Sequence, residues 1–389
     1  MRRDAFKVGV AKVKITPEGK VFLAGFNRNR ISEGVHDDLY IRAVIIGDKS
    51  DKLALVSADL IGLFKDYTGP IREHIERTFN IKRSHIICCC THTHSGPDTI
   101  GLWGPDCLTS GLNELYMRRL KEKFILAIYE ALRNMQEAII EYSWKWIEPR
   151  GIVRNTRDPH LVDRYLAVIR IRNLEEKSIA TIVNFACHPE VLDNSNKLIT
   201  SDYPYYLREY LENKLGGLAI FFNGALGGML TPDVRLRSFS EAKKVGEKLG
   251  EEAIKALNNA HELEYTSMKV RYSTFKIPQR NEIFKNAFMR GLIKRRIFND
   301  YIETEINLIH IGEISIASLP GEALPRVGME LRGGMNSRCK LILGLANDEI
   351  GYIIPSDAWD ASKYEESMSL GSETADIILN EFYRLMARE

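Results

Sequence analysis

Two histidines separated by one residue, His92 and His94, carry the strongest chemical signal in this chain. They stand in the string HTHSGP at residues 92–97, directly after the apolar run HIICCCT. In an extended string, alternate side chains share one face, so both imidazoles would point the same way. Two neutral imidazoles on one face suit a transition-metal ion, zinc first. Structural histidines on a solvated loop would explain the pair equally well, so a site requires further ligands.

Further polar segments follow three other apolar runs. His188 comes after a run that ends at Phe185, Glu322 follows Pro-Gly after the run ISIAS, and residues 346–352 follow a run that ends at Leu345. Loops at strand ends converge in α/β proteins, which brings such residues together. Two histidines, one glutamate and an open position would make a catalytic zinc site. The alternatives are a hydrogen-bonded loop histidine, a first-turn helix acid and a plain turn.

The elements that would position these segments alternate between strands and helices. Apolar alternation and short buried runs predict strands at 7–15, 40–47, 52–60, 85–91, 165–172, 180–185, 218–222, 268–275, 306–310, 313–318 and 339–345. Helical spacing predicts helices at 70–79, 113–135, 203–214, 240–260 and 374–386. We therefore expect an α/β fold with mixed β-sheets and flanking helices, in a single domain over residues 1–389. The polar, basic and aromatic segment 282–301 is expected to be an insertion or a substrate lid.

Composition narrows the possible partners. A net charge of +2 argues against nucleic-acid binding, and the short basic clusters, Arg2-Arg3 and residues 294–296, are expected to be solvated faces. No stretch approaches the roughly 20 apolar residues of a transmembrane helix. No apolar run typical of a signal peptide follows Arg2-Arg3, so the cytoplasm is the simplest expected location. The oligomeric state is left open.

The six cysteines do not form a recognisable metal or redox motif. Cys88, Cys89 and Cys90 are consecutive, and the other three are scattered without CxxC spacing. Neighbouring residues of a strand point to opposite faces, so three cysteines in a row cannot converge on one ion. We expect buried free thiols.

The string THTHSGP at residues 91–97 is specific, and six other segments accompany it in a fixed order. They are VGVAKVKITP at 8–17, GVHDDLYIRAVII at 34–46, LVSADLIGL at 55–63, NFACHP at 184–189, LPGEAL at 319–324 and GLANDEIGYI at 344–353. Together they resemble the neutral/alkaline non-lysosomal ceramidase superfamily over nearly the whole chain. The resemblance implies the fold of the ceramidase catalytic domain in a short form, without a C-terminal immunoglobulin-like domain.

The same resemblance implies a set of site residues. One zinc ion would be held by His92, His188, Glu322 and Tyr352, while His94 would face the substrate and stabilise the oxyanion together with Tyr352. Ceramidases cleave the amide of ceramide, so the implied activity is zinc-dependent hydrolysis of a small N-acylated substrate by activated water, with a place in lipid metabolism.

Weaker assignments accompany this set. Asn155 and Arg157 faintly echo the family's substrate segment and are expected to bind a polar or anionic head, unless they form a surface turn. Thr231 stands where the family has a serine that is assigned to the active site, and we expect it to contact the substrate. His36 and Asp59 are expected to orient the metal-bound imidazoles, because such rings usually donate their second N–H.

Two other classes of function are weighed against the amidohydrolase. A metal-dependent esterase, deacetylase or phosphoesterase on the same fold would recruit aspartates such as Asp59 and Asp202, and two metal ions would favour it. A non-catalytic binding protein of the same fold would bind no metal.

Overall fold

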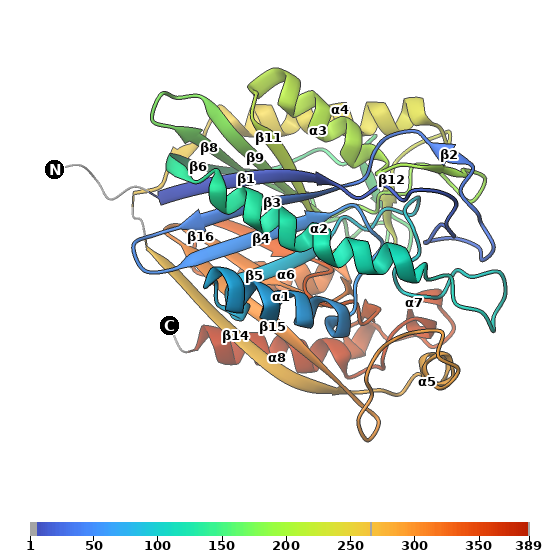
Figure 1. Cartoon of the computed structure of the whole chain (residues 1–389). Coiled ribbons are helices and arrows are strands. Elements are labelled where there is room, and N and C mark those ends of the chain that lie inside the picture. Colours follow the sequence, from blue (N-terminus) through green and yellow to red (C-terminus); the bar gives the residue numbers. More distant parts are fainter. Residues whose placement is uncertain (1–5, 265–266, 388–389) are drawn as a thin grey trace.

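The computed structural model describes residues 6–264 and 267–387 of the chain. Two β-sheets pack face to face, and helices cover the outer face of each sheet, so the layers run helix, sheet, sheet, helix (Figure 1). This arrangement confirms the expected α/β fold with mixed sheets and flanking helices. Arg2 and Arg3 lie outside the described residues.

The larger sheet contains both antiparallel and parallel pairs. Its strands run in the order β11 (Leu218–Asn223), β9 (Ser178–Phe185), β8 (Tyr165–Asn173), β6 (Gln136–Trp146), β1 (Phe6–Lys14), β3 (Tyr40–Gly47), β4 (Lys52–Ala58) and β5 (Ile86–Cys90), with β13 (His261–Glu262) on β6. The pairs β4–β5 and β9–β11 are parallel. The smaller sheet runs β14 (Met268–Pro278), β15 (Tyr301–Ile311), β16 (Ile314–Ser318) and β18 (Cys339–Leu343), of which β16 and β18 are parallel.

The remaining elements are helices and short strands. The helices are α1 (Lys65–Phe79), α2 (Glu114–Arg133), α3 (Tyr203–Leu215), α4 (Phe239–Leu257), α5 (Glu282–Met289), α6 (Pro325–Gly334), α7 (Tyr364–Ser367) and α8 (Thr374–Met386), with 3-10 turns at Arg83–His85 and Ser356–Ala358. The short strands are β2 (Gly34–Val35), β7 (Val153–Asn155), β10 (Leu198–Ile199), β12 (Leu230–Pro232), β17 (Glu322–Ala323) and β19 (Tyr352–Ile353).

Burial on both faces explains why the central strands read as nearly continuous apolar runs. In β3, Ile41, Ala43 and Ile45 belong to the core beneath α1 and α2. Val44 and Ile46 point the other way, into the core shared with the smaller sheet. Helices α3 and α4 cover the other half of the helical face, and α6 and α8 cover the outside of the smaller sheet.

Most expected elements are present, with ends that differ by a few residues, but α1 starts earlier than the sequence indicates. It begins at Lys65, so Pro70, expected in the first turn, lies inside the helix. The carboxylate of Asp348 accepts the backbone N–H of Lys65 at 2.8 Å and so supplies a cap from the far end of the chain. Strand β6 and helices α5 and α6 were not expected at all.

Five of the six free cysteines are buried as expected, and Cys107 is exposed. Burial raises the pKa of the Cys88 thiol to about 12, so it is uncharged at neutral pH. Within the described ranges, none of the helices has the combination of length and apolar character that crossing a membrane requires.

Candidate metal centre

Segments that follow four strands meet at one end of the sandwich. His92 follows β5 and His188 follows β9 in the larger sheet, while Glu322 in β17 follows β16 and Tyr352 in β19 follows β18 in the smaller sheet. Strands β17 and β19 pair in parallel with Glu322 opposite Tyr352. All four side chains are buried. The structure therefore brings together the four residues expected from the sequence to bind metal.

The two histidines turn their Nε2 atoms toward one carboxylate. His92 Nδ1 donates to the carbonyl of Ile61 at 2.6 Å, and His188 Nδ1 donates to the carbonyl of Leu230 at 3.1 Å. A carbonyl only accepts, so each ring carries a proton on Nδ1, and Nε2 is the nitrogen that a metal ion would take. The two Nε2 atoms lie 3.4 Å and 3.1 Å from Oε2 of Glu322. Backbone carbonyls commonly orient metal-binding imidazoles in this way.

The electrostatics of the site also suit a cation. Burial alone would raise the pKa of the Glu322 carboxyl, but the imidazoles of His92 and His188 outweigh it and hold that pKa well below its usual value. Burial raises the pKa of Tyr352 well above its usual value, and the neighbouring Glu322 raises it further. Without a bound cation, the carboxylate is thus charged and the phenol protonated at neutral pH.

His94 joins the site by a different route from the one expected. His92 has a φ of 71°, in the left-handed region, so the string is not extended and the two rings do not share a strand face. They nevertheless lie 5.0 Å apart between ring centroids. Donor nitrogens of His92, His94 and His188 all lie within 4.8 Å of one another, so the three imidazoles together could hold a metal ion.

The His94 ring is neutral and lacks hydrogen bonds. Burial lowers its pKa well below the usual value, and His92 and His188 lower it further. Its Nδ1 lies 3.3 Å from a carboxylate oxygen of Glu190, but neither ring nitrogen has a hydrogen-bond partner of acceptable geometry. A buried imidazole with unpaired nitrogens is available to a bound ligand.

A cavity opens beside these residues. His92, His94, Glu322 and Tyr352 form part of its wall. The rest is mainly apolar and includes Ile61, Ile100, Trp103, Phe284, Ile293 and Ile297. The last three of these belong to segment 282–301, so this segment contributes a wall of the cavity, and its role as a lid stays a prediction. The cavity combines convergent polar groups with an apolar lining, as ligand sites do.

One side chain that the sequence analysis missed joins the two histidine segments. Asn223, at the end of β11, is fully buried. Its Nδ2 donates to the carbonyl of Thr91 at 3.0 Å and to that of Cys187 at 2.8 Å. Those two residues immediately precede His92 and His188. A polar amide that ends the apolar strand LAIFFN was the available signal.

Glu349 is a second missed residue, although its segment was among the polar clusters after strands. It is buried and lines the cavity. Its Oε1 accepts the N–H of Gly351 at 2.9 Å, whereas Oε2 has no hydrogen-bond partner. Burial raises the pKa of the Glu349 carboxyl, and the nearby Glu322 raises it further.

The residues expected to orient the imidazoles act elsewhere. His36 bonds Asp37 at 3.0 Å and stacks on Phe239 at 3.7 Å between centroids. Asp59 forms a two-pronged ion pair with Arg208, at 2.7 and 3.0 Å. The backbone carbonyls of Ile61 and Leu230 accept the Nδ1–H groups of the two metal-site rings, the contact that was expected from His36 or Asp59.

The three residues expected to bind substrate are not part of the cavity wall among the described residues. Asn155 accepts the N–H of Arg157 at 2.9 Å and so builds a turn. The Arg157 guanidinium bonds both carboxylate oxygens of Glu366 at 3.0 and 2.7 Å. Thr231 lies in β12, with a buried hydroxyl that lacks a partner. Their roles toward a substrate stay predictions.

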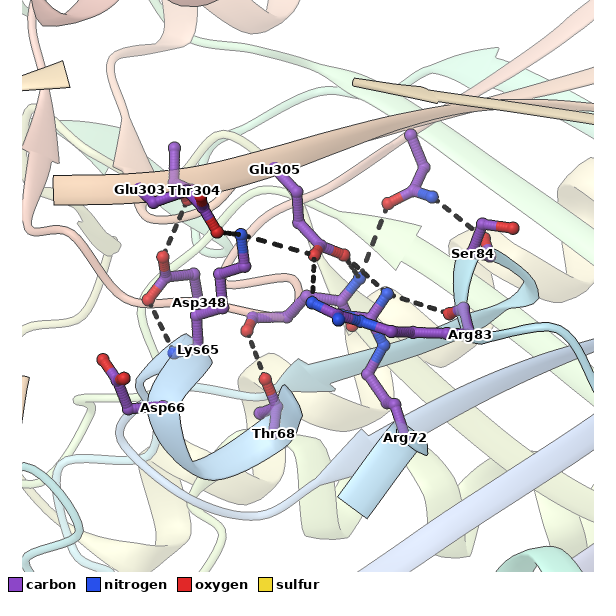
Figure 2. Close-up of polar contacts among 12 residues, drawn as sticks. Lys65, Asp66, Thr68, Arg72, Arg83, Ser84, Glu303, Thr304, Glu305 and Asp348 are labelled. Atoms are coloured by element: carbon purple, nitrogen blue, oxygen red, sulfur yellow. Dashed lines mark hydrogen bonds and ion pairs between the residues drawn. The ribbon is translucent and has the colours of Figure 1, made fainter. Parts of the chain in front are cut away.

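A buried ionic cluster supports the loop that carries Glu349 and Tyr352. Figure 2 shows Glu305 of β15 beside Lys65, Arg72 and Arg83, and the shortest of these ion pairs, to Arg72, measures 2.5 Å. The carboxylate of Asp348 accepts hydrogen bonds from the backbone N–H of Lys65 and from the hydroxyl of Thr304 (Figure 2). These bonds hold the loop against α1 and the smaller sheet.

Arg295 belongs to the same support, which corrects the expectation that residues 294–296 form a solvated face. Lys294 and Arg296 are exposed, but the Arg295 side chain is buried and donates to Asp348 at 2.6 Å. The partly exposed cluster therefore has one member whose charge is neutralised inside the protein.

The sequence is similar to known proteins over about half of its length. The sequence model of one family, the neutral/alkaline non-lysosomal ceramidases (N-terminal part), matches residues 6–219. The neutral ceramidase of Drosophila melanogaster is 24% identical over 241 residues, which are 56% of this chain and 34% of that protein. Neutral ceramidase B of Dictyostelium discoideum is 24% identical over 55% of this chain and 32% of its own length. The matched region thus spans about a third of these relatives.

Solved structures support the same relationship at the level of the fold. A neutral ceramidase from Pseudomonas aeruginosa superposes with a TM-score of 0.84 at 18% identity, covering 99% of this chain and 75% of that one. A ceramidase complexed with C2 superposes with a TM-score of 0.84 at 17% identity, covering 98% and 75%. The expected ceramidase-like fold is confirmed.

Proposed function

The chain belongs to the neutral/alkaline non-lysosomal ceramidase family, and from this premise we propose that it is a zinc-dependent hydrolase that cleaves the amide bond of an N-acylated substrate. One observation carries the proposal. Two buried imidazoles, fixed by backbone carbonyls, turn their Nε2 atoms toward one buried carboxylate oxygen. A family member that had lost its metal would have no physical reason to keep this costly arrangement.

The donor set fits zinc. His92, His188, Glu322 and Tyr352 would hold one ion, and nitrogen and carboxylate ligands are those that zinc prefers in catalytic sites. Zinc supplies two effects when bound at such a site: it polarises a carbonyl oxygen and lowers the pKa of a water molecule to about 7.

The protein's own groups would perform the remaining work. The neutral His94 ring borders the cavity with unpaired nitrogens, so it can hydrogen-bond the carbonyl oxygen of a substrate as negative charge develops there. The protonated phenol of Tyr352 can donate to the same oxygen while it is not bound to metal. One preorganised donor of this kind is typically worth about 10²–10³ in rate.

The lining of the cavity supports an apolar acyl group as the part of the substrate that enters. Ile61, Ile100, Phe284 and Ile293 present hydrocarbon next to the polar centre. Burying an acyl chain against such walls gains about 0.8 kcal/mol for each CH₂ group. An N-acyl compound fits this combination, because its amide and its chain demand opposite environments.

The test combines metal content with hydrolysis. Purified protein should contain about one zinc ion per chain and should release fatty acid from a panel of N-acyl amines that includes ceramide. His92→Ala should lose both the metal and the activity. His160→Ala, which removes an exposed histidine, is the matched control and should change neither. Full metal content and full activity in His92→Ala would refute the proposed site.

A further inference from the structure

A second buried carboxylate lies next to the proposed ligands. One oxygen of Glu349, one oxygen of Glu322 and one nitrogen of His92 all lie within 4.8 Å of one another. Glu349 is 9% exposed, and it comes from the same loop as Tyr352. Two carboxylates this close, in a buried site, repel each other unless a cation or a proton lies between them.

The contacts of Glu349 leave this repulsion uncompensated. Its Oε1 accepts a single backbone N–H, from Gly351, and its Oε2 has no hydrogen-bond partner. The arginine that lines the same cavity, Arg295, is already engaged with Asp66 and Asp348. Leaving a buried charged oxygen without a partner costs several kcal/mol, so native proteins rarely do so.

We propose that Glu349 is a further ligand of the metal ion, which binds between His92, Glu322 and Glu349 as well as His188. This inference rests on the proposed function, because it concerns the same ion. The distances permit it. With all three separations at most 4.8 Å, some point lies within about 2.8 Å of all three atoms (4.8 Å divided by √3), against about 2.0–2.2 Å for zinc bonds. Side-chain adjustments of at most about 0.8 Å close the gap at these three atoms.

Charge balance favours the same assignment. If His92 and His188 bind as neutral rings and Tyr352 keeps its phenolic proton, two carboxylates neutralise a divalent cation in this site and one does not. A fifth protein donor also raises the coordination number above the four of a tetrahedral zinc site. Glu349 therefore changes which metal geometry this chain prefers.

Glu349→Gln is the sharpest variant. Glutamine keeps the shape of the side chain and an oxygen that accepts from Gly351, but it removes the charge. Glu141→Gln is the matched control, because Glu141 is also 9% exposed and its loss changes the net charge equally, yet it lies on β6 against Arg170 and Arg172.

The experiment measures the affinity for Zn²⁺ by competition with a chromogenic chelator, and the visible absorption spectrum of the Co²⁺ form. We expect Glu349→Gln to bind Zn²⁺ 10- to 100-fold more weakly than the parent protein. Its Co²⁺ form should show the stronger absorption of lower coordination. Glu141→Gln should match the parent in both readouts.

A second variant approaches the same carboxylate without altering any charge. A Cβ at Gly62 would lie 2.8 Å from Cγ of Glu349 and 3.2 Å from its Oε2. Gly62→Ala should therefore displace the carboxylate and weaken Zn²⁺ binding in the same direction. It preserves the test if Glu349→Gln does not fold.

The outcomes separate this inference from the proposed function. Unchanged affinity and an unchanged Co²⁺ spectrum in Glu349→Gln and Gly62→Ala would overturn the assignment of Glu349 alone. Tighter binding in Glu349→Gln would also overturn it, because it would indicate a carboxylate that opposes the ion or shares a proton with Glu322. A parent protein that binds no Zn²⁺ would instead refute the proposed function.

Discussion

Replacing Asn223 with alanine tests how the two histidine segments are aligned. The side chain makes four hydrogen bonds: two to the carbonyls of Thr91 and Cys187, and two from the N–H groups of Cys187 and Gly224. Gly224 N–H keeps a second acceptor, the carbonyl of Phe185 at 3.0 Å, and the Cys187 carbonyl keeps a second donor, the hydroxyl of Tyr203 at 2.8 Å. Two groups, the Thr91 carbonyl and the Cys187 N–H, therefore lose their partner without replacement. At about 1 kcal/mol for each group, the free energy of unfolding should fall by about 2 kcal/mol.

The same substitution should reach the metal centre. Thr91 and Cys187 immediately precede His92 and His188, so removing the amide that joins these two segments lets the rings move relative to Glu322. Loss of supporting hydrogen bonds around metal ligands typically weakens binding by about 10- to 100-fold. Urea denaturation of the metal-free protein gives the stability, and Zn²⁺ competition gives the affinity. Asn134→Ala, which removes an exposed amide with one 3.4 Å bond, should change stability by less than about 1 kcal/mol.

Two results would contradict this reasoning. A loss of stability below about 1 kcal/mol in Asn223→Ala would mean that the buried amide bonds contribute no more than exposed ones. The whole expected decrease in the free energy of unfolding, together with unchanged Zn²⁺ affinity, would mean that the amide supports the fold without aligning the histidines.

Three further perturbations follow from contacts around the site. Burial alone would raise the pKa of the Glu305 carboxyl, but adjacent arginines and a lysine outweigh it and lower that pKa. Its stabilising effect is therefore complete above the unfolded pKa of about 4.3 and is lost as pH falls through the folded pKa. Glu305→Gln should be about 3 kcal/mol less stable than the parent protein at pH 7. Between pH 7 and pH 3.5 the variant should lose less stability than the parent protein does, and urea denaturation at both pH values measures this difference. Gly25→Ala should lower hydrolysis at least tenfold, because its Cβ would lie 2.3 Å from Cγ of His94; Gly19→Ala, also at positive φ but in open space, should leave the rate unchanged. Arg295→Met should cost about 3–5 kcal/mol in denaturation experiments because it leaves a buried aspartate unpaired, and a cost below 1 kcal/mol would show that this ion pair does not support the loop.

The sequence predicts the parts of this site that depend on local pattern. Apolar runs followed by His92, His188 and Glu322 mark strand ends, and strand ends of stacked sheets meet. The terminal helix at 374–386 is predicted with its observed bounds for the same reason, because its apolar spacing is local.

Other features depend on residues that are far apart in the chain. The cap on Lys65 comes from Asp348, 283 residues later, so the start of α1 could not be located from its own segment. Asn223 reaches back 132 residues to Thr91. Glu349 looks like a turn residue until the fold places it against Glu322. Side-chain hydrogen bonds of this range leave no periodic trace in sequence.

The donors of the metal centre are divided between the two sheets. His92 and His188 follow strands of the larger sheet, and Glu322 and Tyr352 follow strands of the smaller one. A metal ion bound to all four residues therefore couples local unfolding of one sheet to local unfolding of the other. Amide hydrogen exchange in β16 and β18 should then slow together with exchange in β5 and β9 on adding Zn²⁺, as one cooperative unit instead of two.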